Sequence, residues 1–298
     1  MTKPYRVVYV VGVRNCGSTM LDAILGNAPG AFSLGEAGAF HRFRREQACT
    51  CGEPPASCGP CRAVVDAWED DPGLDRATGL FERPAKGRCL HWTVLPTAAR
   101  RAYARTADRQ LSAVAGATGA TVLVDSSKNI GRAAALLLDG GHDVRIVHLV
   151  RDPRGHLQSQ RRRAGSTRRE SATAVFAEWV VKNLVVSTLL RARAGGPRFL
   201  RCRYEDLVVD PVGVLARIGA YADLDTSGLA EAATGPGLAR THLFERRRRF
   251  DYRVVRVDAS RLGGQRMERA QNRRFWWSGG FVARLWGYDR GQRYLAPR

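Results

Sequence analysis

The stretch Val7-Val8-Tyr9-Val10-Val11, followed by Gly12-Val13-Arg14-Asn15-Cys16-Gly17-Ser18-Thr19, decides the fold of this 298-residue chain. The apolar run, extended to residues 5–11, predicts a strand buried on both faces, and a helical pattern begins at Thr19. A strand, a glycine-bounded loop and a helix in this order are typical of a phosphate-binding loop, whose backbone N–H groups surround an anion. The loop that binds nucleoside triphosphates has a lysine where this chain has Ser18. We therefore expect an anion site without the usual grip on a γ-phosphate.

The rest of the chain alternates strands and helices. Further apolar, β-branched runs predict strands at 121–124, 144–150 and 198–202. Helical patterns occupy 19–26, 98–115, 132–138, 155–163, 171–194 and 212–222. This order predicts one α/β domain over residues 1–298, a three-layer sandwich around a central parallel sheet.

Polar groups follow three of the predicted strands. They are the loop at Gly12, Asp125-Ser126-Ser127-Lys128, and Arg151-Asp152-Pro153-Arg154. Ligands of parallel sheets bind beyond the carboxyl ends of the strands. We therefore expect these three strand ends to converge on one site.

The chain is strongly basic, with a formal net charge of +20, which indicates affinity for nucleotides, nucleic acid, acidic glycans or anionic lipids. Only 4 of its 48 basic residues are lysines, which suggests a general preference for arginine codons and favours a diffuse arginine surface over a dedicated polyanion site. No uninterrupted apolar run approaches the roughly 20 residues of a membrane span, so we expect no transmembrane segment. The N-terminal apolar run ends without a cleavage site, so we expect no signal peptide and a cytoplasmic location.

Four cysteines gather in a loop rich in glycine and proline at residues 49–61: Cys49, Cys51, Cys58 and Cys61. Their spacing, C-x-C-x6-C-x2-C, allows a structural zinc site in a reducing compartment. It differs from the commoner pairing of two C-x2-C motifs. One or two local disulfides, or four reduced thiols, remain alternatives.

The last quarter of the chain is less regular. Residues 227–264 are rich in glycine and charge, and we expect substrate loops or a lid there. The aromatic clusters Phe275-Trp276-Trp277 and Trp286-Gly287-Tyr288 are expected to cap the core beside a terminal helix rather than to form a membrane or base-stacking patch.

A second anion signal follows the strand at 144–150. Asp152 suits the N-cap of a helix and Pro153 its first position, so a helix should begin where the strand ends. Arg151 then lies at the strand terminus and Ser159 about two turns into the helix, where a guanidinium and a hydroxyl can hold a phosphate between them. Two anion sites without a triphosphate lysine suit a nucleotide that is phosphorylated at two places.

These motifs resemble those of sulfotransferases. Arg14 to Leu21 resembles the 5′-phosphosulfate loop of that family, and Arg151-Asp152-Pro153 with Ser159 resembles its 3′-phosphate motif. Tyr204-Glu205-Asp206-Leu207-Val208, followed by Asp210-Pro211, is similar to another segment common in the family. The resemblance covers residues 5–65 and 120–222. It implies transfer of a sulfuryl group from 3′-phosphoadenosine 5′-phosphosulfate to a hydroxyl or amine of a small molecule, lipid or glycan, with no metal in that step.

The resemblance also implies residue roles. Glu36, in the segment Gly35-Glu36, is the candidate base, with His41 in reserve, and Lys128 is expected to stabilise the bridging oxygen. The family commonly has Lys or Arg where this chain has Asn15, so Arg14 is expected to hold the phosphosulfate instead. The implied donor-binding residues are Arg14, Asn15, Cys16, Gly17, Ser18, Thr19, Arg151, Ser159 and Tyr204.

Two other functions compete with this one. A P-loop kinase would use the same loop but lacks its lysine at Ser18. A basic nucleic-acid-binding protein would use the +20 charge, and its affinity would fall steeply with salt. We favour the sulfotransferase and expect no nucleic-acid partner.

Overall fold

The computed structural model describes residues 5–39, 49, 51–69, 96–164, 171–239, 254–259, 262, 269–277 and 280–290. Within these residues lies a five-stranded sheet of order β2-β3-β1-β4-β5, in which every neighbouring pair is parallel. The strands are β1 (Arg6–Val11), β2 (Ala31–Gly35), β3 (Val122–Asp125), β4 (Asp143–Val150) and β5 (Phe199–Arg203). The predicted α/β class is confirmed. Because all strands are parallel, their carboxyl ends lie along one edge of the sheet.

The helices occur where the sequence patterns predict them, with additions. The helical elements are η1 (Ala37–Ala39), α1 (Ser18–Leu25), α3 (Gly59–Glu69), α6 (Thr97–Thr118), α7 (Ile130–Asp139), α8 (Pro153–Ala164), α9 (Ala172–Val185), η2 (Val186–Leu190), α10 (Arg191–Ala194), η3 (Gly196–Arg198), α11 (Tyr204–Val209), α12 (Pro211–Ala222), α13 (Leu229–Thr234), α15 (Arg269–Trp277) and η4 (Gly280–Trp286). The predictions missed α3, α11 and α13 and, in the five-stranded sheet, the strand β2. Each is short or begins at Gly or Pro, so its periodicity is weak.

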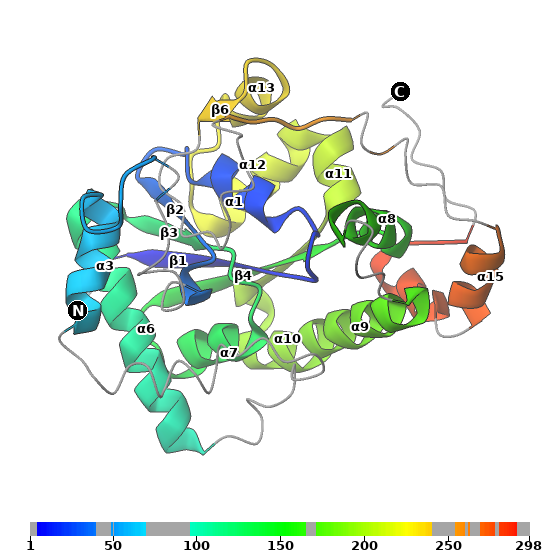
Figure 1. Cartoon of the computed structure of the whole chain (residues 1–298), viewed down its shortest axis with the longest axis horizontal. Coiled ribbons are helices and arrows are strands. Elements are labelled where there is room, and N and C mark those ends of the chain that lie inside the picture. Colours follow the sequence, from blue (N-terminus) through cyan, green and yellow to red (C-terminus); the bar gives the residue numbers. More distant parts are fainter. Residues whose placement is uncertain are drawn as a thin grey trace.

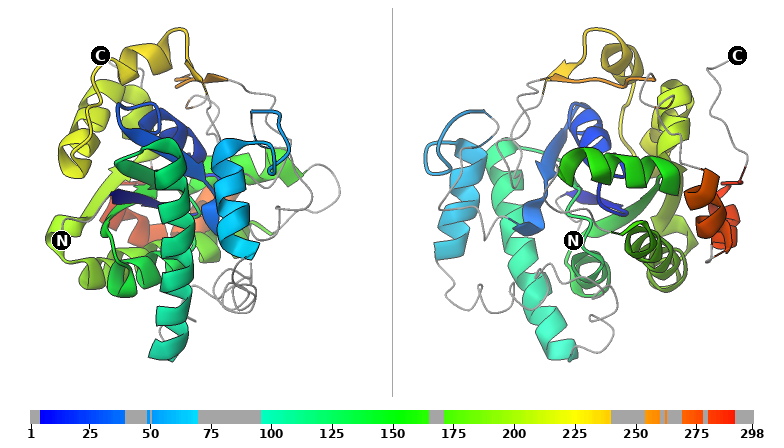
Figure 2. Two further views of the ribbon diagram at one scale, coloured as in Figure 1. Left: turned by 90° about the vertical axis from the view of Figure 1, so that its left-hand side faces the viewer. Right: turned by 45° about the vertical axis from the view of Figure 1, so that its right-hand side comes forward.

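The helices cover both faces of the sheet (Figure 1), where α1, α11 and α12 lie above it and α6, α7 and α10 below. Side chains alternate along β1, so that Val8 and Val10 pack into one core layer while Val7, Tyr9 and Val11 pack into the other. This explains why β1 is apolar at every position. Helix α3 packs beside α6 at the β2 side of the molecule (Figure 2).

One helical run is long and largely apolar, although charged residues interrupt it. It comprises α9, the π-helical segment η2 and α10, and with 23 residues and a mean hydropathy of 1.4 it meets the length and composition of a membrane span. In this fold Phe176, Trp179 and Leu190 are buried in the core. A core helix of a globular domain gives the same pattern. The run therefore does not by itself indicate a membrane span.

The region predicted as loops or a lid has regular structure in its described part. Helix α13 is followed by β6 (Leu238–Ala239), which pairs antiparallel with β7 (Val254–Val255). The two strands and α13 contact α1, and Asn27 Nδ2 donates to Ala239 O at 3.0 Å. This segment therefore covers the helix that follows the phosphate-binding loop. Whether it acts as a lid stays a prediction.

The C-terminal aromatic residues pack around one buried tryptophan. Phe275, Trp286 and Tyr288 lie edge-on to Trp179 of α9, with ring centroids 6.1, 5.1 and 6.3 Å away. The predicted capping role is confirmed for these side chains because each is almost fully buried. Trp277 differs, since 83% of it is exposed.

Candidate active site

The loop after β1 has the backbone of an anion site. Asn15 and Gly17 have positive φ angles of 61° and 99°, and Gly17 is the N-cap of α1. The first turn of α1 has no side-chain cap and no acidic residue. Its N–H groups are therefore suited to an external anion, and Ser18 and Thr19 add hydroxyls at the same turn.

The two glycines of the loop are required by close packing. A Cβ on Gly12 would lie 2.4 Å from the carbonyl oxygen of Leu149 in β4. A Cβ on Gly17 would lie 2.4 Å from Cδ2 of Tyr204. Both glycines thus allow the loop to lie directly on neighbouring elements, and the positive φ of Gly17 adds a second reason for glycine there.

Arg151 joins the end of β4 to this loop. Its Nη1 donates to the carbonyl oxygen of Asn15 at 2.8 Å, and its guanidinium lies 4.3 Å above the ring of Tyr204. Trp179 Nε1 donates to the Arg151 carbonyl at 2.8 Å and fixes the backbone. Within the part of the chain that the structure describes, the buried Nε of Arg151 has no acceptor. This N–H therefore suits a ligand oxygen.

The helix after Arg151 begins as predicted. Asp152 Oδ1 accepts the backbone N–H of Arg154 at 2.7 Å, which is an N-cap bond at the start of α8. Ser159 lies on the same helix and is partly buried. The motif therefore has the local geometry expected of it, while phosphate binding by Arg151 and Ser159 stays a prediction.

Tyr204 lies between the loop after β1 and the side chain of Arg151. It starts α11 directly after β5, and it is 4% exposed. Gly17 packs on its ring and Arg151 stacks over it. Tyr204 thus supports both motifs from within the protein.

The predicted base and cation are in contact. Lys128 Nζ donates to Glu36 Oε1 at 2.8 Å and to the carbonyl of Ser126 at 3.0 Å. Glu36 follows β2 and Lys128 follows β3, and the backbone N–H of Ser126 donates to Gly35 O at 2.8 Å. Pairing of the two strands therefore brings these side chains together at the edge of the sheet.

Asp22 fixes the end of β2, and the sequence analysis missed it. Its Oδ2 accepts from Ser33 Oγ at 2.6 Å and from the backbone N–H of Gly35 at 3.1 Å. Asp22 is fully buried, and burial, reinforced by the charge of Asp125, raises its pKa to about 8. The only sequence signal is an acidic residue within the apolar helix α1.

A second buried carboxylate supports the turn after β3. Asp125 Oδ2 accepts from Arg132 Nε at 2.8 Å, and both side chains are fully buried. The backbone N–H of Ser127 donates to Asp125 Oδ1 at 2.9 Å. Asn129 caps α7 by accepting from Arg132 N at 3.2 Å. Lys128, which has a φ of 61°, is thus held in a turn whose neighbours are fixed on both sides.

Helix α9 contributes two more charged residues that the sequence analysis missed. Glu178 Oε2 accepts from Arg14 Nη2 at 3.4 Å, so Arg14 is paired within the protein. Lys182 follows Glu178 by one helical turn, on the same face of α9. Burial lowers the pKa of Lys182, Lys128 and Arg14 lower it further, and Glu178 and Cys16 oppose the change. Lys182 therefore lies within electrostatic range of the loop. The sequence feature that could have pointed to it is a lysine within an apolar helix of an arginine-rich chain.

His156 of α8 is a further buried group near the loop. It is 1% exposed, and its pKa is lowered to about 3, first by burial and then by the charges of Arg151 and Arg14. The ring is therefore neutral at ordinary pH and adds no positive charge beside Arg151. His41, the reserve base, lies outside the described residues.

Comparisons with known proteins agree with these motifs. A model described as the sulfotransferase family matches residues 7–228. The sulfotransferase domain from the Synechococcus PCC 7002 olefin synthase is similar, with a TM-score of 0.54, 20% identity and 97% of each chain covered. The sulfotransferase domain from the curacin biosynthetic pathway has a TM-score of 0.52 and 14% identity over 97% of this chain and 99% of that chain. A search of curated proteins found no significant match.

The two structural similarities show that the fold is shared, and the family match adds the function. It runs from β1 through α12, so it includes the phosphate-binding loop, Glu36, Lys128, Arg151, Ser159 and Tyr204. This span also carries both motifs and the contact between them. The chain therefore belongs to the sulfotransferase family and is a sulfotransferase.

Proposed function

We propose that this enzyme transfers a sulfuryl group from 3′-phosphoadenosine 5′-phosphosulfate to a hydroxyl or amine of a small-molecule, lipid or glycan acceptor. The main support for this function is the 2.8 Å hydrogen bond from Arg151 Nη1 to the carbonyl oxygen of Asn15. It places a guanidinium from one anion motif directly against the loop of the other. A nucleotide with separate 5′ and 3′ phosphates needs two such elements close together.

The donor is held by the following groups. Backbone N–H groups of residues 17–19 and the hydroxyls of Ser18 and Thr19 bind the 5′-phosphosulfate, whereas the N–H of Cys16 donates to the carbonyl of Val13 at 3.3 Å. Arg151 and Ser159 bind the 3′-phosphate, and the buried Arg151 Nε, which has no acceptor within the described residues, gives that phosphate a charge-assisted hydrogen bond. Tyr204 keeps the two sites at a constant separation.

The transfer step needs a base and positive charge. The acceptor oxygen or nitrogen attacks sulfur, its proton passes to Glu36, and the bond from sulfur to the bridging oxygen breaks. The electron pair of that bond remains on the 5′-phosphate of the leaving adenosine 3′,5′-bisphosphate. Lys128 stabilises this developing charge by hydrogen bonding to the bridging oxygen.

Lys182 supplies the positive charge that the family commonly has at position 15, where this chain has Asn15. Arg14 is paired with Glu178, and its side chain is 49% exposed, so it is poorly placed to supply the missing charge alone. Lys182 is partly buried and within electrostatic range of Cys16 in the loop. We therefore assign Lys182 to the phosphosulfate beside Lys128.

Because Lys128 and Glu36 form an ion pair, donor binding also affects the availability of the base. Without donor, Lys128 occupies the carboxylate that must accept the proton. A bound sulfonate competes for the ammonium group and releases Glu36 toward the acceptor. The base is then available only when there is a sulfuryl group to transfer.

A thermal-shift titration with adenosine 3′,5′-bisphosphate, ATP and an oligonucleotide tests the donor. We expect the bisphosphate to raise the melting temperature more than ATP and more than the oligonucleotide. Stabilisation by ATP alone would instead favour a kinase, and stabilisation by the oligonucleotide alone a nucleic-acid-binding protein.

The acceptor requires a separate experiment. The enzyme is incubated with host extract and donor carrying labelled sulfur, and labelled products are identified by mass spectrometry. A product heavier by one sulfonate identifies the acceptor class.

We also place the enzyme in the cytoplasm, because its several thiols are compatible with the reducing conditions there.

A further inference from the structure

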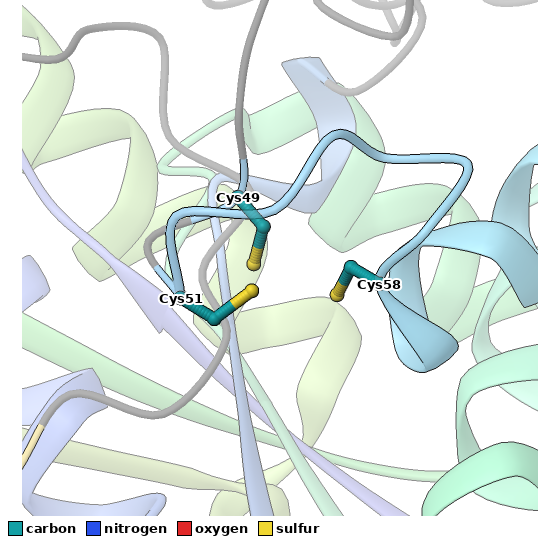
Figure 3. Close-up of side chains that lie close together, drawn as sticks. All are labelled: Cys49, Cys51 and Cys58. Carbon is teal, nitrogen blue, oxygen red and sulfur yellow. The ribbon is translucent and has the colours of Figure 1, made fainter.

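Three cysteine thiols meet in the loop before α3. The Sγ atoms of Cys49, Cys51 and Cys58 all lie within 4.8 Å of one another and point toward a common centre (Figure 3). Cys49 and Cys58 are 7% and 3% exposed, whereas Cys51 is exposed. Each sulfur thus lies close to two others rather than to a single partner. This arrangement is more typical of ligands around one metal ion than of a disulfide.

Cys61 supplies a fourth sulfur. It lies in the first turn of α3, is 2% exposed, and has thiol hydrogen bonds with Cys49 and Cys58. A fourth thiol therefore lies beside two members of the three-sulfur group. Four cysteine sulfurs are the usual donor set of a structural, tetrahedral zinc site.

The backbone of the loop is arranged for negatively charged sulfur. The N–H of Glu53 donates to the Cys51 sulfur, and the N–H of Cys61 donates to the Cys58 sulfur. A turn at Gly52, with a φ of 97°, brings the N–H groups into place, and it is closed by the bond from Gly52 N to Cys49 O at 2.9 Å. The N-terminus of α3 adds the favourable end of a helix dipole beside Cys58 and Cys61.

We propose that Cys49, Cys51, Cys58 and Cys61 bind one zinc ion in a tetrahedral, structural site. The four thiolates coordinate the metal and leave no position for substrate, so the site has no part in the transfer step.

The site lies in the core layer that also contains residues near the candidate base in the sequence. Cys49, Cys58 and Cys61 belong to the same buried cluster as Leu34 and Ala37, which flank Glu36 in the sequence. Helix α3 packs on α6, which anchors it to the core. The first turn of α3 is also held by the metal, through Cys61. Zinc thereby orders the residues that lead into α3, and the free energy of zinc binding contributes to folding.

The metal content of the purified full-length protein tests the proposal. Elemental analysis is expected to find about one zinc per chain, and a mercurial thiol reagent is expected to release it. Replacement by Co²⁺ should give the visible absorption of a tetrahedral thiolate centre. A protein without zinc whose intact mass shows the loss of thiol hydrogens contains disulfides, and that result overturns the proposal, as does iron in place of zinc.

Variants locate the metal. Cys51→Ser changes the exposed ligand and is expected to lower zinc occupancy at least tenfold with little effect on the core. Cys58→Ser is expected to abolish it. Cys202→Ala is the matched control, because Cys202 is 1% exposed in β5 and belongs to the other core cluster. Full zinc retention in both cluster variants, or equal loss in the control, would show that the four cysteines do not form the site.

Discussion

Lys128 Nζ lies 2.8 Å from Glu36 Oε1, although 92 residues separate the two in the chain. The contact exists because β2 and β3 are parallel neighbours whose carboxyl ends lie side by side. The side chains are 10% and 28% exposed, so solvent screens the pair only in part. Substitution of either residue therefore changes the environment of the other.

Glu36→Gln should abolish sulfuryl transfer while leaving nucleotide binding intact. Glutamine keeps the shape and can still accept from Lys128, but it cannot take a proton. We expect kcat to fall about 100-fold or more, with the dissociation constant of adenosine 3′,5′-bisphosphate changed less than about threefold. Steady-state kinetics and calorimetry measure the two quantities. Full turnover in this variant would refute the assignment of the base.

Arg151→Ala should weaken binding of the 3′-phosphate selectively. Loss of a charge-assisted hydrogen bond to phosphate is expected to cost about 2 kcal/mol, or roughly thirtyfold in affinity for adenosine 3′,5′-bisphosphate. Adenosine 5′-phosphosulfate has no 3′-phosphate, so its affinity should change much less. Arg201→Ala, which removes one exposed arginine of β5, controls for the loss of positive charge alone. Equal losses for both ligands would mean that Arg151 only supports the loop.

Lys182→Met should lower kcat/KM about tenfold to a hundredfold without lowering the melting temperature. Methionine removes the charge that we assign to the phosphosulfate but retains an apolar chain of similar length. Because burial disfavours the charged lysine, its replacement should not destabilise the fold. Lys182→Arg keeps a cation and is expected to recover part of the activity. An unchanged kcat/KM in Lys182→Met, measured beside its melting temperature, would remove Lys182 from the site.

Glu205→Gln should change how stability depends on pH. Glu205 accepts from Asp152 N at 2.9 Å and from Tyr288 Oη at 2.7 Å, and burial, with the charge of Asp152, raises its pKa from 4.5 to about 7. Between these values the folded protein keeps a proton that the unfolded chain has lost. Ionisation of Glu205 therefore lowers the free energy of unfolding as pH rises from about 4.5 to about 7, by at most about 3 kcal/mol.

Glutamine resembles the protonated form and removes this slope. The melting temperature of the variant minus that of the wild type should therefore rise between about pH 5 and about pH 7.5, a range that covers most of the transition. His156 gives an opposite slope below its ordinary pKa because its folded-state pKa is about 3, but it is present in both proteins and cancels in the difference. A difference that does not vary with pH would show that Glu205 is ionised in the folded protein throughout this range.

Features carried by a continuous stretch of chain were predicted from the sequence. β1, its loop and α1 were recognised because strand, glycine turn and helix each have a local pattern of residues. The cap at Asp152 and the start of α8 at Pro153 were predicted for the same reason, since capping bonds join neighbouring residues. The alternation of strands and helices along the chain predicted a parallel sheet. A parallel sheet in turn predicted that the polar strand ends meet at one edge.

The tertiary structure decided which distant side chains touch. β2 has a short pattern interrupted by Ser33 and Gly35, and it is a strand because β3 pairs with it and Asp22 binds its end. Lys182 comes within electrostatic range of the phosphate-binding loop only through the packing of α9, and Tyr204 joins two motifs that lie far apart in sequence. Such contacts are fixed by burial and by hydrogen bonds between elements, which depend on the packed fold. The sequence by itself therefore determined four of the five strands, the loop and the chemical family of the site, while packing determined the edge strand β2, the ion pair of Glu36 and Lys128 and the positions of the remaining charges.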